Sequence, residues 1–339
     1  MSARRRKFRH GRPGRRYFWR RALRLRLVVL VGLALVLAAC GGGDGEGNSV
    51  AERTESGTLR IGEFSWSAAV LTNTILEGIV ARHPELGIEQ VERVKAGPER
   101  GWKRLGDGRL DVLTEVYVPN QLTFSRRARR ETELVSRTYR DAINGWFVPR
   151  YAVEPGGPAD GLVRVDQLNR YRDVLDRKLF DGEPGWVTTE QNADRIRGFG
   201  LRLEQVKGSE TKLLRELERR FRAREPMLLY LWRPHWVHAA YELEALDEPI
   251  PYRPGCFRGS RGACAMPTND VWVAARKDLA GRAPRVWELL RRFRLPIGDL
   301  EAMLAEVDRR ELPADEVAGR WLDEHTELVA SWIPPASGS

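Results

Sequence analysis

Residues 227–241, MLLYLWRPHWVHAAY, combine an apolar run with two tryptophans around a proline. The run MLLYL predicts a buried β-strand, and Pro234 is a residue that ends a strand. Trp232 therefore falls at the C-terminal end of this strand. Packing in the core is the ordinary role of such a side chain, and a wall that binds a cation is the alternative. The rest of the chain bears on the choice.

Strand and helix patterns alternate on both sides of this stretch. Strands are expected at 58–64, 88–97, 110–117, 143–153, 227–232 and 269–278. Helices are expected at 65–83, after residue 99, and at 162–179, 187–200, 208–226, 283–293, 297–308 and 313–332. A chain of 339 residues with this alternation is long enough for two α/β lobes built on parallel sheets. Such folds bind ligands in a crevice beyond the strand ends.

The formal net charge of +10 comes from the N-terminus alone. Residues 1–39 contain twelve Arg or Lys and no Asp or Glu, so the remaining chain carries a net charge of about −2. A nearly neutral body gives no reason to expect a nucleic-acid partner.

The N-terminus has the features of an export signal. Basic residues precede the apolar run Leu27–Ala39, whose thirteen residues fall short of the roughly 20 that span a membrane. The sequence LAAC at 37–40 resembles a bacterial lipoprotein signal, in which the cysteine becomes the lipid-bearing first residue of the mature chain. The Gly-rich stretch that follows suits a tether, whereas an ordinary secretory peptide is the alternative. We therefore expect the chain at the extracytoplasmic face of a bacterial cell membrane, anchored through Cys40.

Two further cysteines, Cys256 and Cys264, lie in the stretch GCFRGSRGAC. In an extracytoplasmic chain, cysteines this close together can form a disulfide, with free thiols as the alternative. A metal site would need further ligands, and none cluster nearby in the sequence. We expect a disulfide and no metal.

Four aromatic residues fall at the predicted mouths of elements rather than inside them. Trp66, Tyr117 and Trp232 lie at strand ends or just after them, and Trp186 lies in a Pro-Gly turn before a helix. A quaternary ammonium group donates no strong hydrogen bond and is held by π-faces, each worth roughly 0.5–2 kcal/mol. The four residues are therefore candidates for a cage around such a cation. A carboxylate on the ligand would suit backbone N–H groups at the helix start.

The sequence lacks the common signatures of catalysis, namely a G-x-S-x-G elbow, a Walker loop, a Rossmann fingerprint and an H-E-x-x-H pair. His235 and His238 are spaced H-x-x-H, but no third metal ligand is evident, and a pair on a helix surface is the simpler interpretation. We therefore expect a binding protein without a cofactor rather than an enzyme. The rivals are a receptor for another small solute such as an amino acid, which would need a charged pocket, an exported hydrolase on a similar frame, and a structural lipoprotein that binds no solute.

Several motifs carry a family resemblance. They are FSWSAAVLTN (64–73), GDGRLDVLTEVYVPN (106–120), GWFVPRY (145–151), PGWVTTEQN (184–192), YLWRPHWV (230–237) and LPIGDLEAMLAEVD (295–308). Together they resemble the glycine betaine/choline/proline betaine-binding proteins of ABC transporters, over about residues 58–332. The resemblance implies a bilobal, periplasmic-binding-protein-like (type II) α/β fold, with two lobes joined by a hinge, that closes on a quaternary ammonium compound.

Each cage candidate matches a motif of that family. Trp66 matches the tryptophan after the first strand, and Tyr117 matches the aromatic residue of a W-x-P motif. Trp186 matches the tryptophan of PGW, and Trp232 matches that of W-x-P-x-W. The resemblance implies that at least three of these form the cage, and that the turn before the helix supplies backbone donors to a carboxylate. The implied site residues are Trp66, Tyr117, Trp186, Trp232, Gly185, Val187 and Thr188.

Two departures from the family pattern concern the ligand. Tyr117 stands where the family has a tryptophan, and Leu122 stands where some members have a histidine that helps to hold a carboxylate. Choline and carnitine therefore stay open beside glycine betaine and proline betaine. Glu115 is a candidate partner for a ligand hydroxyl or cation. Arg233 is expected to point away from the site, because its charge would disfavour a cationic ligand.

The expected organisation is a signal peptide (1–39), a tether (40–57), the first part of lobe 1 (58–150), lobe 2 (151–265), the return to lobe 1 (266–332) and a tail (333–339). The resemblance implies a monomer that delivers its ligand to the permease subunit of a cognate ABC transporter, for import and osmoprotection.

Overall fold

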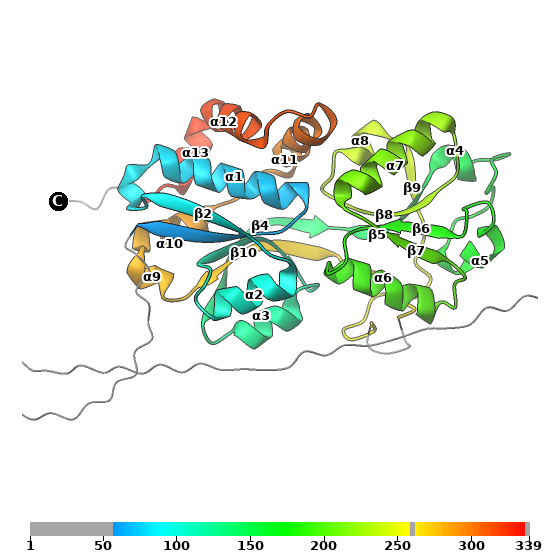
Figure 1. Cartoon of the computed structure of the whole chain (residues 1–339), viewed down its shortest axis with the longest axis horizontal. Helices are drawn as coiled ribbons and strands as arrows, with labels where there is room; N and C mark the ends of the chain where they lie inside the picture. The colour runs from blue at the N-terminus through cyan, green and yellow to red at the C-terminus, as the bar shows by residue number, and fades with distance from the viewer. Residues whose placement is uncertain (1–56, 258–261, 336–339) are drawn as a thin grey trace, which may run out of the picture. The chain divides into compact units, whose positions relative to one another are not determined.

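Two five-stranded sheets organise the part of the chain that the structure, a computed structural model, describes: residues 57–257 and 262–335 (Figure 1). The expected signal peptide, nearly all of the tether and Cys40 lie outside these residues. Within the described ranges, no helix combines the length and the apolar character that crossing a membrane requires.

The first sheet contains the N-terminal strands and one strand from late in the chain. Its order is β2 (Gln90–Lys95), β1 (Thr58–Glu63), β3 (Val112–Val118), β10 (Asn269–Arg276) and β4 (Thr132–Ala142). β1 pairs parallel with both β2 and β3, whereas β10 is antiparallel to β3 and to β4.

The second sheet repeats this plan with different strands. Its order is β7 (Glu204–Lys207), β6 (Lys178–Asp181), β8 (Leu228–Trp232), β5 (Asn144–Pro149) and β9 (Leu243–Ala245). β6 pairs parallel with β7 and β8, and β5 is antiparallel to β8 and β9. In both sheets, three parallel strands are thus followed by an antiparallel one.

Helices cover both faces of each sheet (Figure 1). With the first sheet go α1 (Ser67–Arg82), α2 (Pro98–Gly106), α3 (Leu122–Ala128), α9 (Leu279–Arg282), α10 (Pro284–Arg292), α11 (Ile297–Leu304), α12 (Ala314–Glu324) and α13 (Thr326–Trp332). With the second go α4 (Arg150–Val153), α5 (Leu168–Tyr171), α6 (Val187–Gly198), α7 (Glu210–Ala223) and α8 (Val237–Ala240). Short 3₁₀ turns occur at Pro84–Leu86 and Val165–Gln167, and a π-helical turn at Ala305–Arg309.

The core follows from the two periodicities of the sequence. On α1, Leu71, Ile75 and Ile79 recur every four residues and are fully buried, so they form one face against the sheet. Strand β3 is buried along almost its whole length, as expected of a strand covered on both faces. Burial of these apolar side chains holds each lobe together.

Several expected elements differ from the structure. The sheets are mixed rather than parallel, because β5 and β10 run against their neighbours. Strands β4, β7 and β9 were not expected, since polar and charged residues interrupt the apolar pattern of β4 and the other two strands are very short. The expected helix at 162–179 is only a pair of short turns, and its last residues begin β6.

The chain passes from the first sheet to the second at Ile143, between β4 and β5. Residues up to 150 were instead expected in lobe 1. The difference arises because β5 pairs with β8 and β9 of the second sheet. The residues of β5 alone do not show which strands it will pair with. The strand ends of the two sheets meet at the candidate site.

Candidate functional site

Four aromatic side chains from both lobes meet at the strand ends. Trp66 precedes α1, Tyr117 is the penultimate residue of β3, Trp232 ends β8, and Trp186 directly precedes α6. All four are buried. The carboxyl ends of β1, β3, β6 and β8 thus place their following residues at one crevice, the position expected for ligand sites of α/β sheets.

The four rings contact one another edge to face. Ring centroids are 6.0 Å apart for Trp66 and Tyr117, and 5.7 Å apart for Trp66 and Trp186. Those of Trp186 and Trp232 are 5.4 Å apart, and the interplanar angles of the three pairs are 77°, 86° and 83°. Rings at such angles present π-faces in different directions around a common space.

These rings line a small cavity. Its volume is about 50 Å³, which is room for a few water molecules. Its lining consists of Trp66, Pro98, Tyr117, Asn120, Gln121, Asn144, Trp186, Val187, Thr188, Tyr230 and Trp232. None of these eleven side chains is charged at neutral pH.

Trp186 is held in place by both lobes. Its indole Nε1 donates a hydrogen bond of 2.9 Å to Ser65 Oγ, two residues after the end of β1. A Cβ atom at Gly182 would lie 2.3 Å from the Trp186 ring, so only glycine fits at that turn. The two contacts fix the ring over the cavity.

The expected backbone donors lie at the N-terminus of α6. Val187 and Thr188 line the cavity and are the first two residues of this helix, whose first N–H groups have no partner within the helix. Gly185 does not line the cavity. It takes a φ of 92° in the turn that leads to the helix, a conformation that favours glycine.

Glu115 lies behind two of the rings and is fully buried. Its Oε2 accepts hydrogen bonds of 2.7 Å from Tyr139 Oη and 3.2 Å from Tyr117 Oη, and its Oε1 accepts one of 3.4 Å from Thr72 Oγ1. Burial raises the pKa of Glu115 to about 7, and these donors oppose the rise. The Trp66 indole N–H also lowers this pKa, although it makes no direct hydrogen bond within the described residues.

Four polar and aromatic residues of the cavity were missed in the sequence: Asn120, Gln121, Asn144 and Tyr230. Tyr230 could have been found, because it lies two residues before Trp232 on one strand and so shares its face. Asn144 is paired with Trp232 across the sheet, and its Oδ1 accepts a 2.7 Å bond from Tyr230 Oη. The buried Asn144 Nδ2 has no partner among the described residues. Asn144 therefore brings an unpaired donor to the lining of the cavity.

The expectation for Arg233 agrees with the structure, in which its side chain is exposed and does not line the cavity. The expectation for His235 and His238 was wrong. His235 is buried and precedes α8, and His238 has its Nε2 3.0 Å from the carbonyl oxygen of Trp232. Burial lowers the pKa of His238 to about 4.

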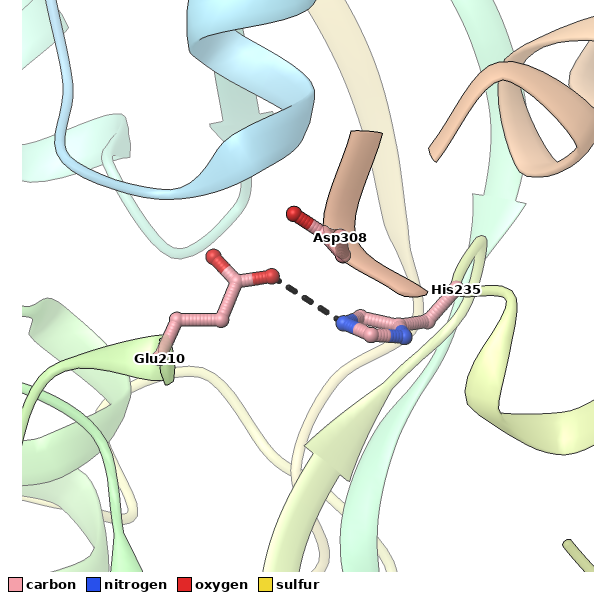
Figure 2. A group of neighbouring side chains, drawn as sticks. All are labelled: Glu210, His235 and Asp308. Atoms are coloured by element: carbon pink, nitrogen blue, oxygen red, sulfur yellow. Dashed lines mark hydrogen bonds and ion pairs between the residues drawn. The ribbon is translucent and has the colours of Figure 1, made fainter. Parts of the chain in front are cut away.

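His235 belongs to a group of ionisable residues that joins the lobes beside the cage, with Glu210 and Asp308 (Figure 2). Its Nε2 lies 3.0 Å from Glu210 Oε1, and its ring stands edge-on to Trp232 at 5.0 Å between centroids. Glu210 Oε2 accepts a 2.8 Å bond from Ser67 N, which follows Trp66 directly. The group therefore links the backbone next to one cage residue with the ring of another.

The ligand atoms of Glu210, His235 and Asp308 lie within 4.8 Å of one another, a spacing that could hold a metal ion. Each atom already has a partner, however. Asp308 accepts bonds from Ser67 Oγ at 2.7 Å and Trp236 Nε1 at 3.0 Å, and His235 Nδ1 accepts one of 3.2 Å from Val237 N. Burial, and then the nearby Glu210 carboxylate, raise the pKa of Asp308 to about 6. These side chains therefore connect the two lobes through hydrogen bonds of their own.

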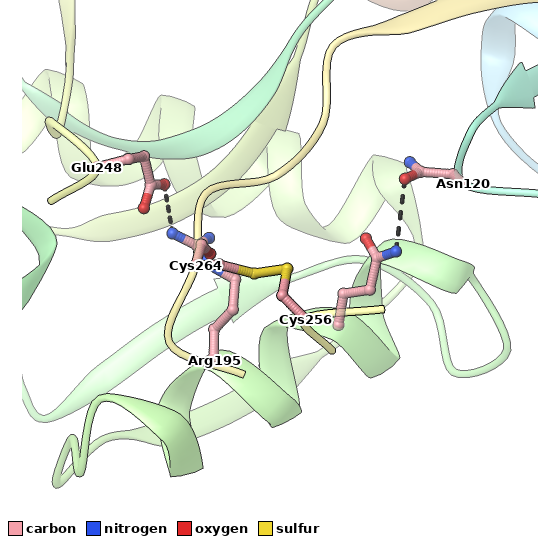
Figure 3. The surroundings of a disulfide bond; sticks show 6 residues. Asn120, Arg195, Glu248, Cys256 and Cys264 are labelled. Atoms are coloured by element: carbon pink, nitrogen blue, oxygen red, sulfur yellow. Dashed lines mark hydrogen bonds and ion pairs between the residues drawn. A yellow bond between two sulfur atoms is a disulfide. The ribbon is translucent and has the colours of Figure 1, made fainter. Parts of the chain in front are cut away.

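Helix α6, which carries the cage turn, is braced from its other side (Figure 3). Cys256 and Cys264 are joined by a disulfide. The residue before Cys264 packs so closely on the helix that a Cβ atom at Gly198 would lie 2.3 Å from Ala263 N. The fully buried Arg195 of α6 donates from Nε to the Cys264 carbonyl oxygen at 3.1 Å. The guanidinium also pairs with Glu248.

The sequence of this chain matches the model of a known protein family. Residues 57–324 match the family model described as the substrate binding domain of the ABC-type glycine betaine transport system. The chain belongs to this family. The family consists of transport proteins, and this membership confirms the expectation of a binding protein rather than an enzyme.

Curated relatives of this family member are distant. The glycine betaine-binding periplasmic protein OusX of Dickeya dadantii is 23% identical over 201 residues, which cover 52% of this chain and 60% of the relative. The glycine betaine/proline betaine-binding periplasmic protein of Salmonella typhimurium is 25% identical over 198 residues, covering 51% and 60%. The matched stretches therefore span about three fifths of each relative.

Solved structures establish the fold of this family member. The closed form of lactococcal OpuAC with glycine betaine superimposes with a TM-score of 0.68 at 17% identity, covering 82% of this chain and all of that one. An ABC-transporter choline-binding protein in complex with choline gives a TM-score of 0.68 at 18% identity, covering 82% and 91%. The two-lobed binding-protein fold expected from the sequence is thus confirmed.

Proposed function

We propose that this chain captures a quaternary ammonium compound in an aromatic cage formed by Trp66, Tyr117, Trp186 and Trp232. The ligand is glycine betaine, choline or a similar compound such as proline betaine or carnitine. The chain delivers it to the permease of a cognate ABC transporter, for import and osmoprotection. Family membership supports the transport role, and the cage chemistry supports the ligand class.

The observation that carries the proposal is the set of four edge-to-face rings around an uncharged cavity that both lobes line. Removing water from a quaternary ammonium ion costs little free energy, because the ion donates no strong hydrogen bonds. Each dry π-face then contributes roughly 1–2 kcal/mol. Aromatic rings from both lobes would make closure part of binding, because neither sheet alone supplies all four.

A second set of groups suits the other end of the ligand. The first N–H groups of α6, from Val187 and Thr188, favour a carboxylate because they lie at the positive end of the helix. The unpaired Asn144 Nδ2 would serve either a carboxylate or a hydroxyl group. These donors are compatible with both betaines and choline.

The proposed location is the extracytoplasmic face of the membrane, with a lipid on Cys40. In a bacterial host, the wild-type chain is expected in the membrane fraction, and Cys40→Ser is expected to lose the lipid and leave that fraction. Mass spectrometry of the mature N-terminus checks this. A wild-type chain whose mature N-terminus carries no lipid would contradict the anchor but not the binding function.

Ligand-induced stabilisation tests the proposed function. Binding to the folded state alone at a hundredfold excess over Kd stabilises it by about 2.7 kcal/mol, which raises the Tm of a domain of this size by about 5 °C. We expect such shifts with one or more of glycine betaine, proline betaine, choline and carnitine, and none with ectoine or proline. The soluble domain, residues 50–339, is the sample, and differential scanning fluorimetry is the measurement. No shift with any quaternary ammonium compound would refute the proposal.

A further inference from the structure

We propose that Glu115 is the counter-charge of the cage, and that it makes the site prefer a ligand of net positive charge, such as choline, over a zwitterion such as glycine betaine. This inference rests on the proposed function, because it concerns the ligand of the same cavity. It assigns a role to a residue that does not line the cavity itself.

The geometry places the carboxylate directly behind the cage wall. Glu115 takes a φ of 53°, in the left-handed region where residues other than glycine are uncommon, two residues before Tyr117 on β3. Its Oε2 accepts a hydrogen bond of 3.2 Å from the Tyr117 hydroxyl group. The carboxylate therefore lies at the hydroxyl end of a ring that lines the cavity. A negative charge there makes the π-face of Tyr117 more attractive to a cation.

The bonding partners of this carboxylate are all neutral. Tyr139 Oη at 2.7 Å and Thr72 Oγ1 at 3.4 Å complete its hydrogen bonds, and no Lys, Arg or His of the described residues pairs with it. A buried carboxylate without a cation is unfavourable, and a cation brought close to it relieves that cost. An ammonium group in the adjacent cavity would be such a cation.

Proton linkage follows from this arrangement. Burial raises the pKa of Glu115 to about 7, so the carboxyl group of the unliganded molecule changes its protonation near neutral pH. A bound cation favours the ionised form, and the affinity for cations is therefore expected to rise as pH increases through 7.

Neighbouring groups do not share this titration. The titratable side chains facing Glu115 are Tyr117 of β3 and Tyr139 of β4, and burial raises the pKa of both phenols well above their usual value, so they stay neutral. From α1 the facing side chain is the neutral Thr72, and β10 presents Val271 and Ala274 alongside β3. Among these facing groups Glu115 is the one that changes charge. Asp308, in the group beside the cage, has a pKa raised to about 6 and bonds to Ser67 and Trp236 instead, so Glu115→Gln separates its titration from that of Glu115.

Isothermal titration calorimetry of the soluble domain tests the inference, with choline, glycine betaine and 3,3-dimethyl-1-butanol, the uncharged carbon analogue of choline, as probes. Between pH 5.5 and 8.5 the wild-type affinity for choline is expected to rise about tenfold, the effect of one nearby charge in a partly screened site. The uncharged analogue is expected to show no rise. Near neutral pH, choline binding is expected to release a fraction of a proton, measured from buffers of different ionisation enthalpy.

Two variants sharpen the test. Glu115→Gln keeps the shape of the side chain, and is expected to weaken choline about tenfold at pH 8.5 and to abolish the pH dependence, while glycine betaine binds as before or more tightly. Tyr139→Phe removes the shortest hydrogen bond to the carboxylate. It is expected to move the midpoint of the choline profile to higher pH, because that bond lowers the pKa of Glu115.

The outcomes separate the two proposals. Choline binding without proton release, or a Glu115→Gln variant that loses choline and glycine betaine equally, would overturn the counter-charge and leave the proposed function standing. Failure of every quaternary ammonium compound to bind the wild type would overturn both. If Glu115→Gln does not fold, the wild-type pH profiles of choline and its uncharged analogue decide the question.

Discussion

Trp232→Ala is expected to weaken binding of the quaternary ammonium ligand by about 100-fold. Its ring is buried, stands edge-on to Trp186 and packs on Tyr230 at 5.6 Å between centroids, so its removal opens one wall of the cavity. The variant loses one dry cation–π contact, and the Trp186 ring loses the neighbour against which it packs. Truncation of such a central aromatic residue costs about 2–4 kcal/mol of binding free energy. Calorimetric titration of the soluble domain measures it.

A matched control separates the cage from general damage. Trp332 on α13 is also buried but does not line the cavity. Trp332→Ala should lower the Tm through loss of core packing while leaving the Kd within about threefold of wild type. Trp232→Phe should recover part of the lost affinity, because it restores a π-face. Equal losses of affinity in the two alanine variants would show that Trp232 acts only in packing.

Arg195→Ala is expected to destabilise the folded chain by about 3–5 kcal/mol, the range found when one partner of a buried ion pair is removed. Its guanidinium is fully buried and stacks on Trp146 with 4.1 Å to the ring centroid. Without it, the largely buried Glu248 carboxylate and the Cys264 carbonyl oxygen lose their partner. Urea denaturation followed by tryptophan fluorescence measures the change in the free energy of unfolding.

The control lies two residues away on the same helix. Arg197 is 63% exposed and pairs with Asp194, so Arg197→Ala should cost less than about 1 kcal/mol. The double variant Arg195→Ala/Glu248→Ala should be less destabilised than the sum of its single variants, because the unpaired carboxylate is gone. An Arg195→Ala variant as stable as Arg197→Ala would mean that water replaces the guanidinium at little cost.

Much of the candidate site could be read from the sequence because it depends on local features. Trp66, Tyr117 and Trp232 follow or end strong apolar strands, and Trp186 precedes a helix with a glycine turn. Such positions fix where a side chain emerges, whichever partners the strand finds. The structure brings all four residues to one cavity.

The groups that surround the cage could not be read in the same way. His235 contacts Glu210 and lies beside Asp308, residues 25 and 73 positions away in the chain. Tyr139, the closest donor to Glu115, lies on β4, and the charged residues of this strand interrupt the apolar alternation by which a strand is predicted. A hydrogen bond between distant residues leaves no periodic trace in either segment, so only the folded chain reveals it.

Two α/β halves, the order of most elements and the aromatic residues at their ends can be predicted from the sequence, because burial imposes periods of two and of about four residues on local segments. The mixed direction of the sheets, the passage between lobes at Ile143 and the position of Glu115 behind Tyr117 become visible only in the folded chain. These depend on which strands pair and which faces meet. That choice is made by the free energy of the whole chain rather than by any one segment.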